Sequence, residues 1–177
     1  SRLNDQVDKV LQIARIEKSG IHLRLETIDL YNVINKVVEN CLANHRDKVA
    51  ITTDLRGEMV HIEADRNHLT NILYNLLDNA VKYAGDSPEI MIQSIRSSKK
   101  VMVTISDNGP GIPKVHQKKV FQKFYRIPTA NVHDVKGFGL GLFYVKSICD
   151  AHQWKVSIDP SPEKGSAFIL EIPLKQQ

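Results

Sequence analysis

The stretch NILYNLLDNAVKY, which runs from Asn71 to Tyr83, decides the fold that this sequence predicts. On a helix, Asn71, Asn75 and Asn79 recur every four residues and share one face, while apolar side chains fill the other. Asparagine has only a moderate helix propensity, so three asparagines followed by Lys82 are unusual on a helix face that contacts only water. Amide oxygens can bind a hard cation such as Mg²⁺, and a lysine can reach a phosphate. The stretch predicts either a helix whose polar face binds a ligand, such as a hard cation with a phosphate, or an amphipathic core helix with an amide-rich polar face.

The composition is that of an ordinary globular domain. The 177 residues are 42% hydrophobic and 25% charged, with a net charge of +4, which suits one well-buried domain. The basic residues are scattered and no aromatic side chains are interleaved to stack on bases, which argues against nucleic acid as a partner. Cys41 and Cys149 lack metal-ligand spacing and favour a reducing, cytoplasmic compartment. No apolar run reaches the roughly 18 residues of a membrane span, so no membrane contact is expected of this chain.

The order of the predicted elements indicates helices packed on a mostly antiparallel sheet. Residues 1–19 predict a helix that packs on a partner helix or on its own domain, with a narrow seam at Leu3, Val7, Val10, Leu11 and Ala14. Further helices are predicted at 29–46, 65–84 and 137–152. Strands are predicted at 21–28 (or an extended linker), 50–55, 60–64, 89–96, 101–107, 155–159 and 167–173. Because they come in blocks, we expect a two-layer α+β sandwich, with about five strands under three helices.

A second chemistry-bearing stretch, DNGPGIP, begins at the end of the strand predicted at 101–107. Strict alternation places Asp107 on the same buried side as Val103 and Ile105. A buried carboxylate needs a donor, which the exocyclic amine of a purine could supply. Gly109 and Gly111 would let the backbone pass close to a flat ring. A turn with Asp107 as a local cap is the competing interpretation.

Two further stretches lie in and after a long polar segment at about 114–136. A connection this long in a compact domain predicts a functional lid or a disordered stretch. Within it, FQKFYR offers aromatic anchors and an arginine, Arg126, that could meet phosphate oxygens. GFGLGL, residues 137–142, precedes a helix and would expose backbone N–H groups to an anion. A short helix that covers the core and a structural turn are the plain alternatives for these two stretches.

Taken in order, these stretches resemble one family, the catalytic, ATP-binding domain of bacterial sensor histidine kinases. The likeness spans about residues 30–174, with NILYNLLDNAVKY similar to the family's asparagine box, DNGPGIP to its first glycine box, FQKFYR to its phenylalanine box and GFGLGL to its second glycine box. The wider superfamily includes gyrase, mismatch-repair and heat-shock chaperone ATPases, so the resemblance implies their Bergerat fold with an ATP lid at about 114–136. It also implies that residues 1–20 are the remnant of the dimerisation and phosphoacceptor helix with its linker, and that 21–177 form the catalytic domain.

The resemblance assigns roles to residues of the four boxes. Asn79 would bind Mg²⁺, with Asn75 and Lys82 facing the phosphates. Tyr83 would lie against the adenine, and Asp107 would accept a hydrogen bond from its amine. The expected catalytic residues are Asn75, Lys82 and Arg126. The residues expected to bind ATP are Asn75, Asn79, Lys82, Tyr83, Asp107, Gly109, Gly111, Ile112, Phe124, Tyr125, Arg126, Lys136, Gly137, Phe138, Gly139, Leu140, Gly141 and Leu142.

Asn75 separates the relatives within this superfamily. Members that hydrolyse ATP typically have a glutamate here that activates water, and an amide cannot act as a general base. The resemblance therefore implies a protein-histidine kinase that binds ATP and Mg²⁺ and transfers the γ-phosphoryl group to a histidine. From this histidine the phosphoryl group would pass to a response regulator. The alternatives are an ATPase or an anti-sigma-type serine kinase on the same fold, or a nucleotide-binding or docking module without turnover.

The resemblance also implies partners and exposes two departures from the family pattern. The expected partners are the protein's own dimerisation and phosphoacceptor domain, in a homodimer, and a response regulator receiver domain, with a parent protein anchored in the inner membrane. None of the seven histidines lies in the family's phosphoacceptor setting, so no autophosphorylation is expected of this chain. The last helix commonly ends in His-Gly-Gly, whereas this chain reads His152-Gln153-Trp154, which leaves that helix end and the packing of Trp154 open.

Overall fold

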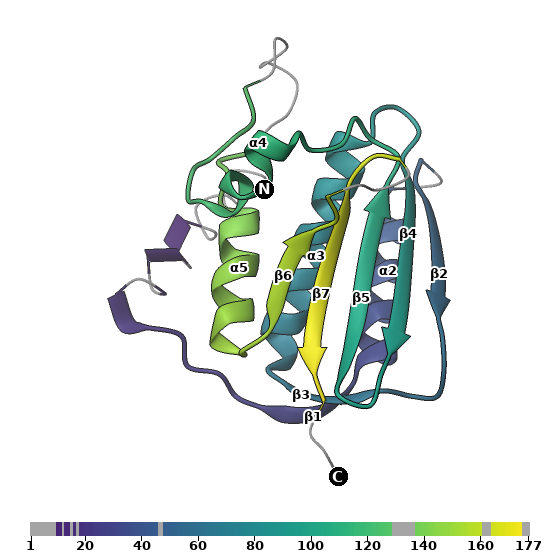
Figure 1. The fold of residues 1–177 in the computed structure, drawn as a ribbon, viewed down its shortest axis with the longest axis vertical. Coiled ribbons are helices and arrows are strands. Elements are labelled where there is room, and N and C mark those ends of the chain that lie inside the picture. Colours follow the sequence, from purple (N-terminus) through teal and green to yellow (C-terminus); the bar gives the residue numbers. More distant parts are fainter. Residues whose placement is uncertain are drawn as a thin grey trace.

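Helices lie on one face of a sheet in the computed structural model, which describes residues 10–11, 13–14, 16, 18–45, 48–128, 137–160 and 164–174 (Figure 1). The helices are α2 (Leu30–His45), α3 (Arg66–Tyr83), α4 (Lys114–Gln117), the 3₁₀ helix η1 (Lys119–Phe121) and α5 (Gly141–Ala151). The strands are β1 (Glu26–Asp29), β2 (Ala50–Leu55), β3 (His61–Ala64), β4 (Glu89–Arg96), β5 (Lys100–Asp107), β6 (Lys155–Ile158) and β7 (Ala167–Pro173).

The main sheet has five strands in the order β2-β4-β5-β7-β6. Only β2 and β4 run parallel, and the other neighbouring pairs are antiparallel. A separate two-stranded sheet joins β1 to β3. The predicted two-layer α+β sandwich, a mixed and mostly antiparallel sheet under three long helices, is confirmed.

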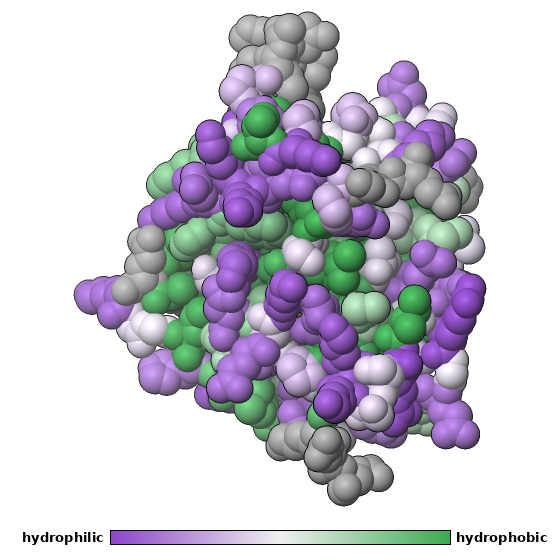
Figure 2. All heavy atoms as spheres, in the orientation of Figure 1, coloured by the Kyte–Doolittle hydropathy of each residue, from purple (hydrophilic) through white to green (hydrophobic). Residues whose placement is uncertain are grey.

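The core lies between the two layers, where periodic apolar side chains from both meet. In β5, burial alternates strictly, with Val101, Val103, Ile105 and Asp107 on the buried side. In α3 the buried side chains recur at helical spacing and face the sheet. The opposite face of the sheet carries polar side chains with scattered apolar ones between them (Figure 2). No helix among the described residues is long and apolar enough to cross a membrane.

The described residues of the N-terminal segment are helical from position 10 to position 19. Val10, Leu11 and Ala14, the described residues of the predicted seam, are exposed, and Leu3 and Val7 lie outside the described residues. Ile13 is instead only 3% exposed and belongs to the core cluster, with Ile16 packed against it. Of the two interpretations offered for this helix, docking on its own domain is therefore confirmed for its described residues, and the contact uses a face other than the seam. Residues 1–9 lie outside the described part of the chain.

Several element ends differ from the predictions. The segment at 21–25 is an extended linker, and β1 begins only at Glu26. The glycine-rich stretch forms no helix before Gly141, and the start of the predicted lid forms α4 and η1. At the end of α5, Gln153 adopts a left-handed φ of 61°. Trp154 N–H then donates to the carbonyl of Cys149 at 2.8 Å, so the turn forms without the family's glycines.

Candidate functional site

Helix α3 positions the asparagine face, and its start is fixed by Asp65. The Asp65 Oδ1 atom accepts hydrogen bonds from the N–H groups of Asn67 and His68, both at 3.1 Å, which confirms the predicted N-cap. The half-buried amides of Asn71, Asn75 and Asn79 follow along this helix. The buried apolar side prevents α3 from rotating, so the amide face is held at the surface of the helix layer.

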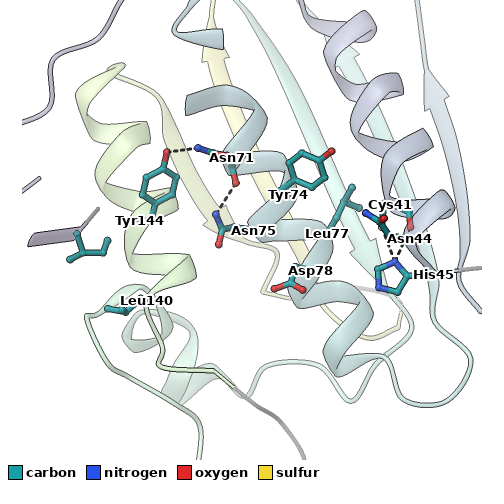
Figure 3. A pocket seen from close by; sticks show the side chains of 11 residues that line it. Cys41, Asn44, His45, Asn71, Tyr74, Asn75, Leu77, Asp78, Leu140 and Tyr144 are labelled. Atoms are coloured by element: carbon teal, nitrogen blue, oxygen red, sulfur yellow. Dashed lines mark hydrogen bonds between the residues drawn. The ribbon is translucent and has the colours of Figure 1, made fainter. Parts of the chain in front are cut away.

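Asn75 connects α3 to the second glycine stretch. Its Nδ2 donates to the carbonyl of Asn71 at 2.8 Å (Figure 3), which leaves Oδ1 to point the other way. A Cβ placed on Gly141 would lie only 2.9 Å from this Oδ1. Because position 141 is a glycine, the start of α5 can lie beside the Asn75 amide without a steric clash.

The first glycine stretch lies under the end of α3, beside Asp107. A Cβ on Gly109 would lie 2.7 Å from the Tyr83 carbonyl oxygen. The Asp107 Oδ1 accepts from the N–H of Gly109 at 2.8 Å and from that of Ser166 at 3.3 Å, and Oδ2 accepts from the Ser166 hydroxyl. Gly165 packs on the Asp107 backbone so closely that a Cβ there would lie 1.9 Å from its carbonyl oxygen.

These contacts correct one step of the sequence argument. Buried Asp107 does not depend on a ligand for donors, because Gly109 and Ser166 already supply them, and the local-cap interpretation is right in this respect. A carboxylate offers about four acceptor positions, so room remains for one further donor. Ser166 was missed, and its only sequence signal is the small Gly165-Ser166-Ala167 run before the last strand.

The phenylalanine stretch meets the second glycine stretch through its backbone. Phe124, with φ of 63°, donates from its N–H to the Gly139 carbonyl at 3.1 Å. A Cβ on Gly139 would lie 2.6 Å from the Tyr125 carbonyl oxygen, so this approach requires glycine. Phe124 is 59% exposed, whereas Phe121 packs edge-to-face on Phe168 at 6.3 Å between ring centroids. Part of the stretch thus covers the core, as its plain alternative predicted, and part projects outward.

The charged candidates lie at the surface. Lys82 pairs with Asp78 at 2.5 Å, and both side chains are substantially exposed. Arg126 is exposed in the described part of the predicted lid, and Lys136 lies outside the described residues. Of the remaining candidates, Phe138 is exposed, Leu140 is buried, and Gly111, Ile112 and Leu142 are half-buried.

The donor set suits Mg²⁺ only if other ligands complete the shell. No group of three or more His, Cys, Asp or Glu side chains in the described residues could hold a metal ion. The amide oxygens of Asn75 and Asn79 are hard neutral ligands, and Mg²⁺ commonly keeps waters and binds substrate phosphates beside a few protein oxygens. The residues present therefore fit Mg²⁺ that arrives with a nucleotide.

A cavity of about 580 Å³ opens next to these residues, between α2, α3 and α5 (Figure 3). Its lining comprises Ile13, Cys41, Asn44, His45, Asn71, Tyr74, Asn75, Leu77, Asp78, Leu140 and Tyr144. Of the described residues that are expected to bind ATP, only Asn75 and Leu140 border it. The cavity is therefore a neighbour of the predicted nucleotide site.

Comparisons with known proteins show which family the sequence matches. Residues 64–176 match the family described as histidine kinase-, DNA gyrase B-, and HSP90-like ATPase. The chain is 40% identical to sensor protein RprX of Bacteroides fragilis (strain YCH46) over 176 residues, which cover 98% of this chain and 34% of RprX. It is 32% identical to the adaptive-response sensory kinase SasA of Prochlorococcus marinus (strain MIT 9313) over 154 residues, 86% of this chain and 41% of SasA. The chain thus spans less than half the length of either relative.

Solved structures give the same result. The catalytic domain of histidine kinase ThkA superposes with a TM-score of 0.74 at 29% identity, covering 85% of this chain and 97% of that domain. ThkA in complex with the response regulator protein TrrA gives a TM-score of 0.82 at 27% identity, covering 99% of this chain and 49% of ThkA. The chain therefore belongs to the histidine kinase-, DNA gyrase B- and HSP90-like ATPase family, with sensor histidine kinases among its relatives in sequence and structure.

Proposed function

We propose that this chain binds Mg²⁺-ATP and transfers the γ-phosphoryl group to a histidine of a dimerisation and phosphoacceptor domain. The proposal depends most on one observation: three close contacts, made by backbone or side-chain atoms, bring the four stretches together. These contacts are Asn75 with Gly141, Tyr83 with Gly109, and Tyr125 with Gly139. At each one a glycine stands where a Cβ would collide, so the stretches are built to lie together.

Asp107 and the first glycine stretch suit the adenine. The carboxylate is buried and held by Gly109 and Ser166, and its remaining acceptor position can take the exocyclic amine. An exocyclic amine is a donor, whereas the corresponding keto group of guanine is an acceptor and would face the carboxylate unfavourably. Tyr83, Gly111 and Ile112 complete this wall in the proposal.

The start of α5 suits the phosphates. Among the described residues no side chain caps this helix, so its first N–H groups are available to an anion and the helix dipole favours negative charge. The stretch from 137 to 142 would supply these N–H groups. Lys82 can leave its exposed ion pair with Asp78 at little cost, because such surface pairs contribute little. Arg126 would approach from the lid.

Asn79, with Asn75 beside it, would hold Mg²⁺ through amide oxygens. When bound, the ion neutralises charge on the phosphates, which is the main requirement of phosphoryl transfer. The protein's own part is to orient the phosphates with Lys82, Arg126 and the α5 N–H groups. Asn75 cannot take a proton from water, so ATP would be kept for the histidine acceptor.

The proposed partners follow from this chemistry. The acceptor histidine would come from the dimerisation and phosphoacceptor domain, of which residues 1–20 are the proposed remnant, within a homodimer of the parent protein. The phosphoryl group would then pass to the aspartate of a response regulator. The solved complex of ThkA with the response regulator protein TrrA, whose kinase chain resembles this one, supports that step.

The direct test of nucleotide binding is titration calorimetry with a non-hydrolysable ATP analogue, with and without Mg²⁺. We expect the wild-type chain to bind, Asp107→Asn to lose its preference for adenine over guanine, and Asn79→Ala to lose the Mg²⁺ dependence. Absence of binding at millimolar nucleotide would refute the proposal and favour a docking module instead.

A further inference from the structure

Helices α3 and α5 carry the two halves of the proposed nucleotide site, and they lie side by side in opposite directions (Figure 1). Three contacts along them show this. Asn75 meets Gly141 at the site, Tyr144 meets His68 further along, and His152 meets Asp65 at the far end. The register between the helices therefore determines where the glycine stretch lies relative to the asparagine side chains.

Tyr144 makes the middle contact. Its ring is buried, and its hydroxyl lies 2.7 Å from His68 Nδ1 and 3.5 Å from Asn71 Nδ2 (Figure 3). The carbonyl of Asn71 in turn accepts from the Asn75 amide. One hydroxyl group on α5 thus holds two side chains on α3, and one of these belongs to the residue that orients Asn75.

His152 makes the far contact, and its geometry defines its protonation state. The Asp65 N–H donates to Nε2 at 3.0 Å, so Nε2 carries no proton. Nδ1 then carries it and donates to the Ile148 carbonyl at 2.9 Å. The imidazole is neutral and uses both nitrogens, one toward each helix, and it stacks on Trp154 at 4.3 Å between ring centroids.

We propose that Tyr144 and His152 are positioning residues that hold α5 in register with α3, and that protonation of His152 loosens this register and weakens nucleotide binding. The proposal rests on the function proposed above. A proton on Nε2 would face the Asp65 N–H, so this hydrogen bond would be lost and a part-buried donor left unpaired. Asn75 lies about ten residues along α3, or about 15 Å from this contact, within one continuous helix.

The charged and titratable groups around His152 support its neutral state. Burial lowers the pKa of His152 and His68 on α3 lowers it further, while the hydrogen bond to the Ile148 carbonyl and the Asp65 carboxylate act in the opposite direction. That carboxylate accepts backbone N–H bonds from Arg24, Asn67 and His68, whereas the contact with His152 is made by the Asp65 backbone N–H. Acidification therefore acts against the contact.

The first arm of the test removes the Tyr144 hydroxyl. We expect Tyr144→Phe to weaken binding of a non-hydrolysable ATP analogue at pH 8 by about threefold to tenfold, the value of one lost hydrogen bond. Tyr31→Phe is the matched control, because the Tyr31 hydroxyl is also hydrogen-bonded to two groups, the Arg56 carbonyl at 2.9 Å and the Ser94 hydroxyl. These bonds join α2 to the end of β2 and to β4, away from the contact between α3 and α5. Tyr31→Phe should reduce stability and leave the affinity within twofold of the wild type. Equal affinity for Tyr144→Phe and wild type would overturn the role of Tyr144.

The second arm is a pH profile of analogue binding between pH 5.5 and 8. His152→Gln keeps a polar group near the Nε2 position and cannot titrate, and His61→Gln replaces an exposed histidine as the control. We expect the affinity of the wild type and of His61→Gln to fall more steeply on acidification than that of His152→Gln. Titration of the nucleotide itself is common to all three and cancels. Parallel profiles would overturn the proposal.

Hydrogen exchange separates this proposal from the proposed function. If the wild type binds no analogue at pH 8, the proposed function fails. Protection of the Asp65 amide and of the Tyr144 amide, which donates to the Leu140 carbonyl at 2.9 Å, still tests the register. These amides should lose protection on acidification in the wild type and keep it in His152→Gln. Equal loss in both proteins would refute the proposal without reference to nucleotide.

Discussion

Gly141→Ala adds a single methyl group at the point where α3 meets α5. The new Cβ would lie 2.9 Å from Asn75 Oδ1, closer than side-chain carbons normally approach oxygen. The backbone of Gly141 is not in the left-handed region, so alanine itself fits the helix. The Asn75 amide must therefore turn away, and it loses its 2.8 Å bond to the Asn71 carbonyl.

The two energy terms act in opposite directions on stability. The lost hydrogen bond costs about 1 kcal/mol. Alanine in place of glycine within a helix contributes about 1 kcal/mol, less at a first position. The free energy of unfolding should therefore change by less than about 1 kcal/mol. Binding has no such compensation, because Asn75 no longer faces the phosphates, and we expect the affinity for the ATP analogue to fall about tenfold, or 1.4 kcal/mol.

The comparison variant is Gly137→Ala, which adds the same methyl group where no atom of the described residues lies within 4 Å. Urea unfolding and analogue titration on both variants separate stability from binding. We expect a clearly smaller loss of affinity for Gly137→Ala than for Gly141→Ala. Equal affinities of the two variants, or a loss of stability in Gly141→Ala that accounts for its weaker binding, would refute the role given to the Asn75–Gly141 contact.

Three further predictions concern single residues. Gln153→Gly should raise the free energy of unfolding by about 0.5–1 kcal/mol because glycine adopts the left-handed φ of 61° without strain, whereas Gln153→Ala should give no gain in urea unfolding. Ser166→Ala should lower stability by about 1–3 kcal/mol and weaken analogue binding, since it removes a buried donor to Asp107; unchanged affinity in calorimetry would contradict this. The pKa of His152 is lowered from 6.5, so below about pH 6.5 the unfolded chain takes up the proton first. The contribution of neutral His152 to the free energy of unfolding is therefore fully present above this range and is lost on acidification. In urea unfolding from pH 7.5 to 5.5, the free energy of unfolding should fall less for His152→Gln than for the wild type.

The parts of the fold that follow from local patterns could be predicted from sequence. The Asp65 cap, the amide face of α3 and the buried side of β5 all depend on residues close together in the chain. Their periodicities of 3.6 and 2 residues are strong signals because the core requires them. The four motifs in order were enough to predict the family.

The contacts that sequence reasoning missed join distant residues. Ser166 meets Asp107 across 59 positions, and this pairing depends on β7 lying beside β5. Ile13 packs in a core cluster whose other residues lie far along the chain, and a heptad pattern cannot predict such a contact. The left-handed turn at Gln153 could not be predicted from the sequence because glutamine is rare in that conformation.

The most direct test of the central claim is the fate of labelled phosphate from ATP. The chain would be incubated with γ-labelled ATP and Mg²⁺, with and without the histidine-bearing domain of its parent protein. We predict label on that domain that is lost in acid and stable in alkali, no label on the chain itself, and little free phosphate. Rapid release of free phosphate by the chain alone, with no label on the domain, would contradict the account and identify an ATPase.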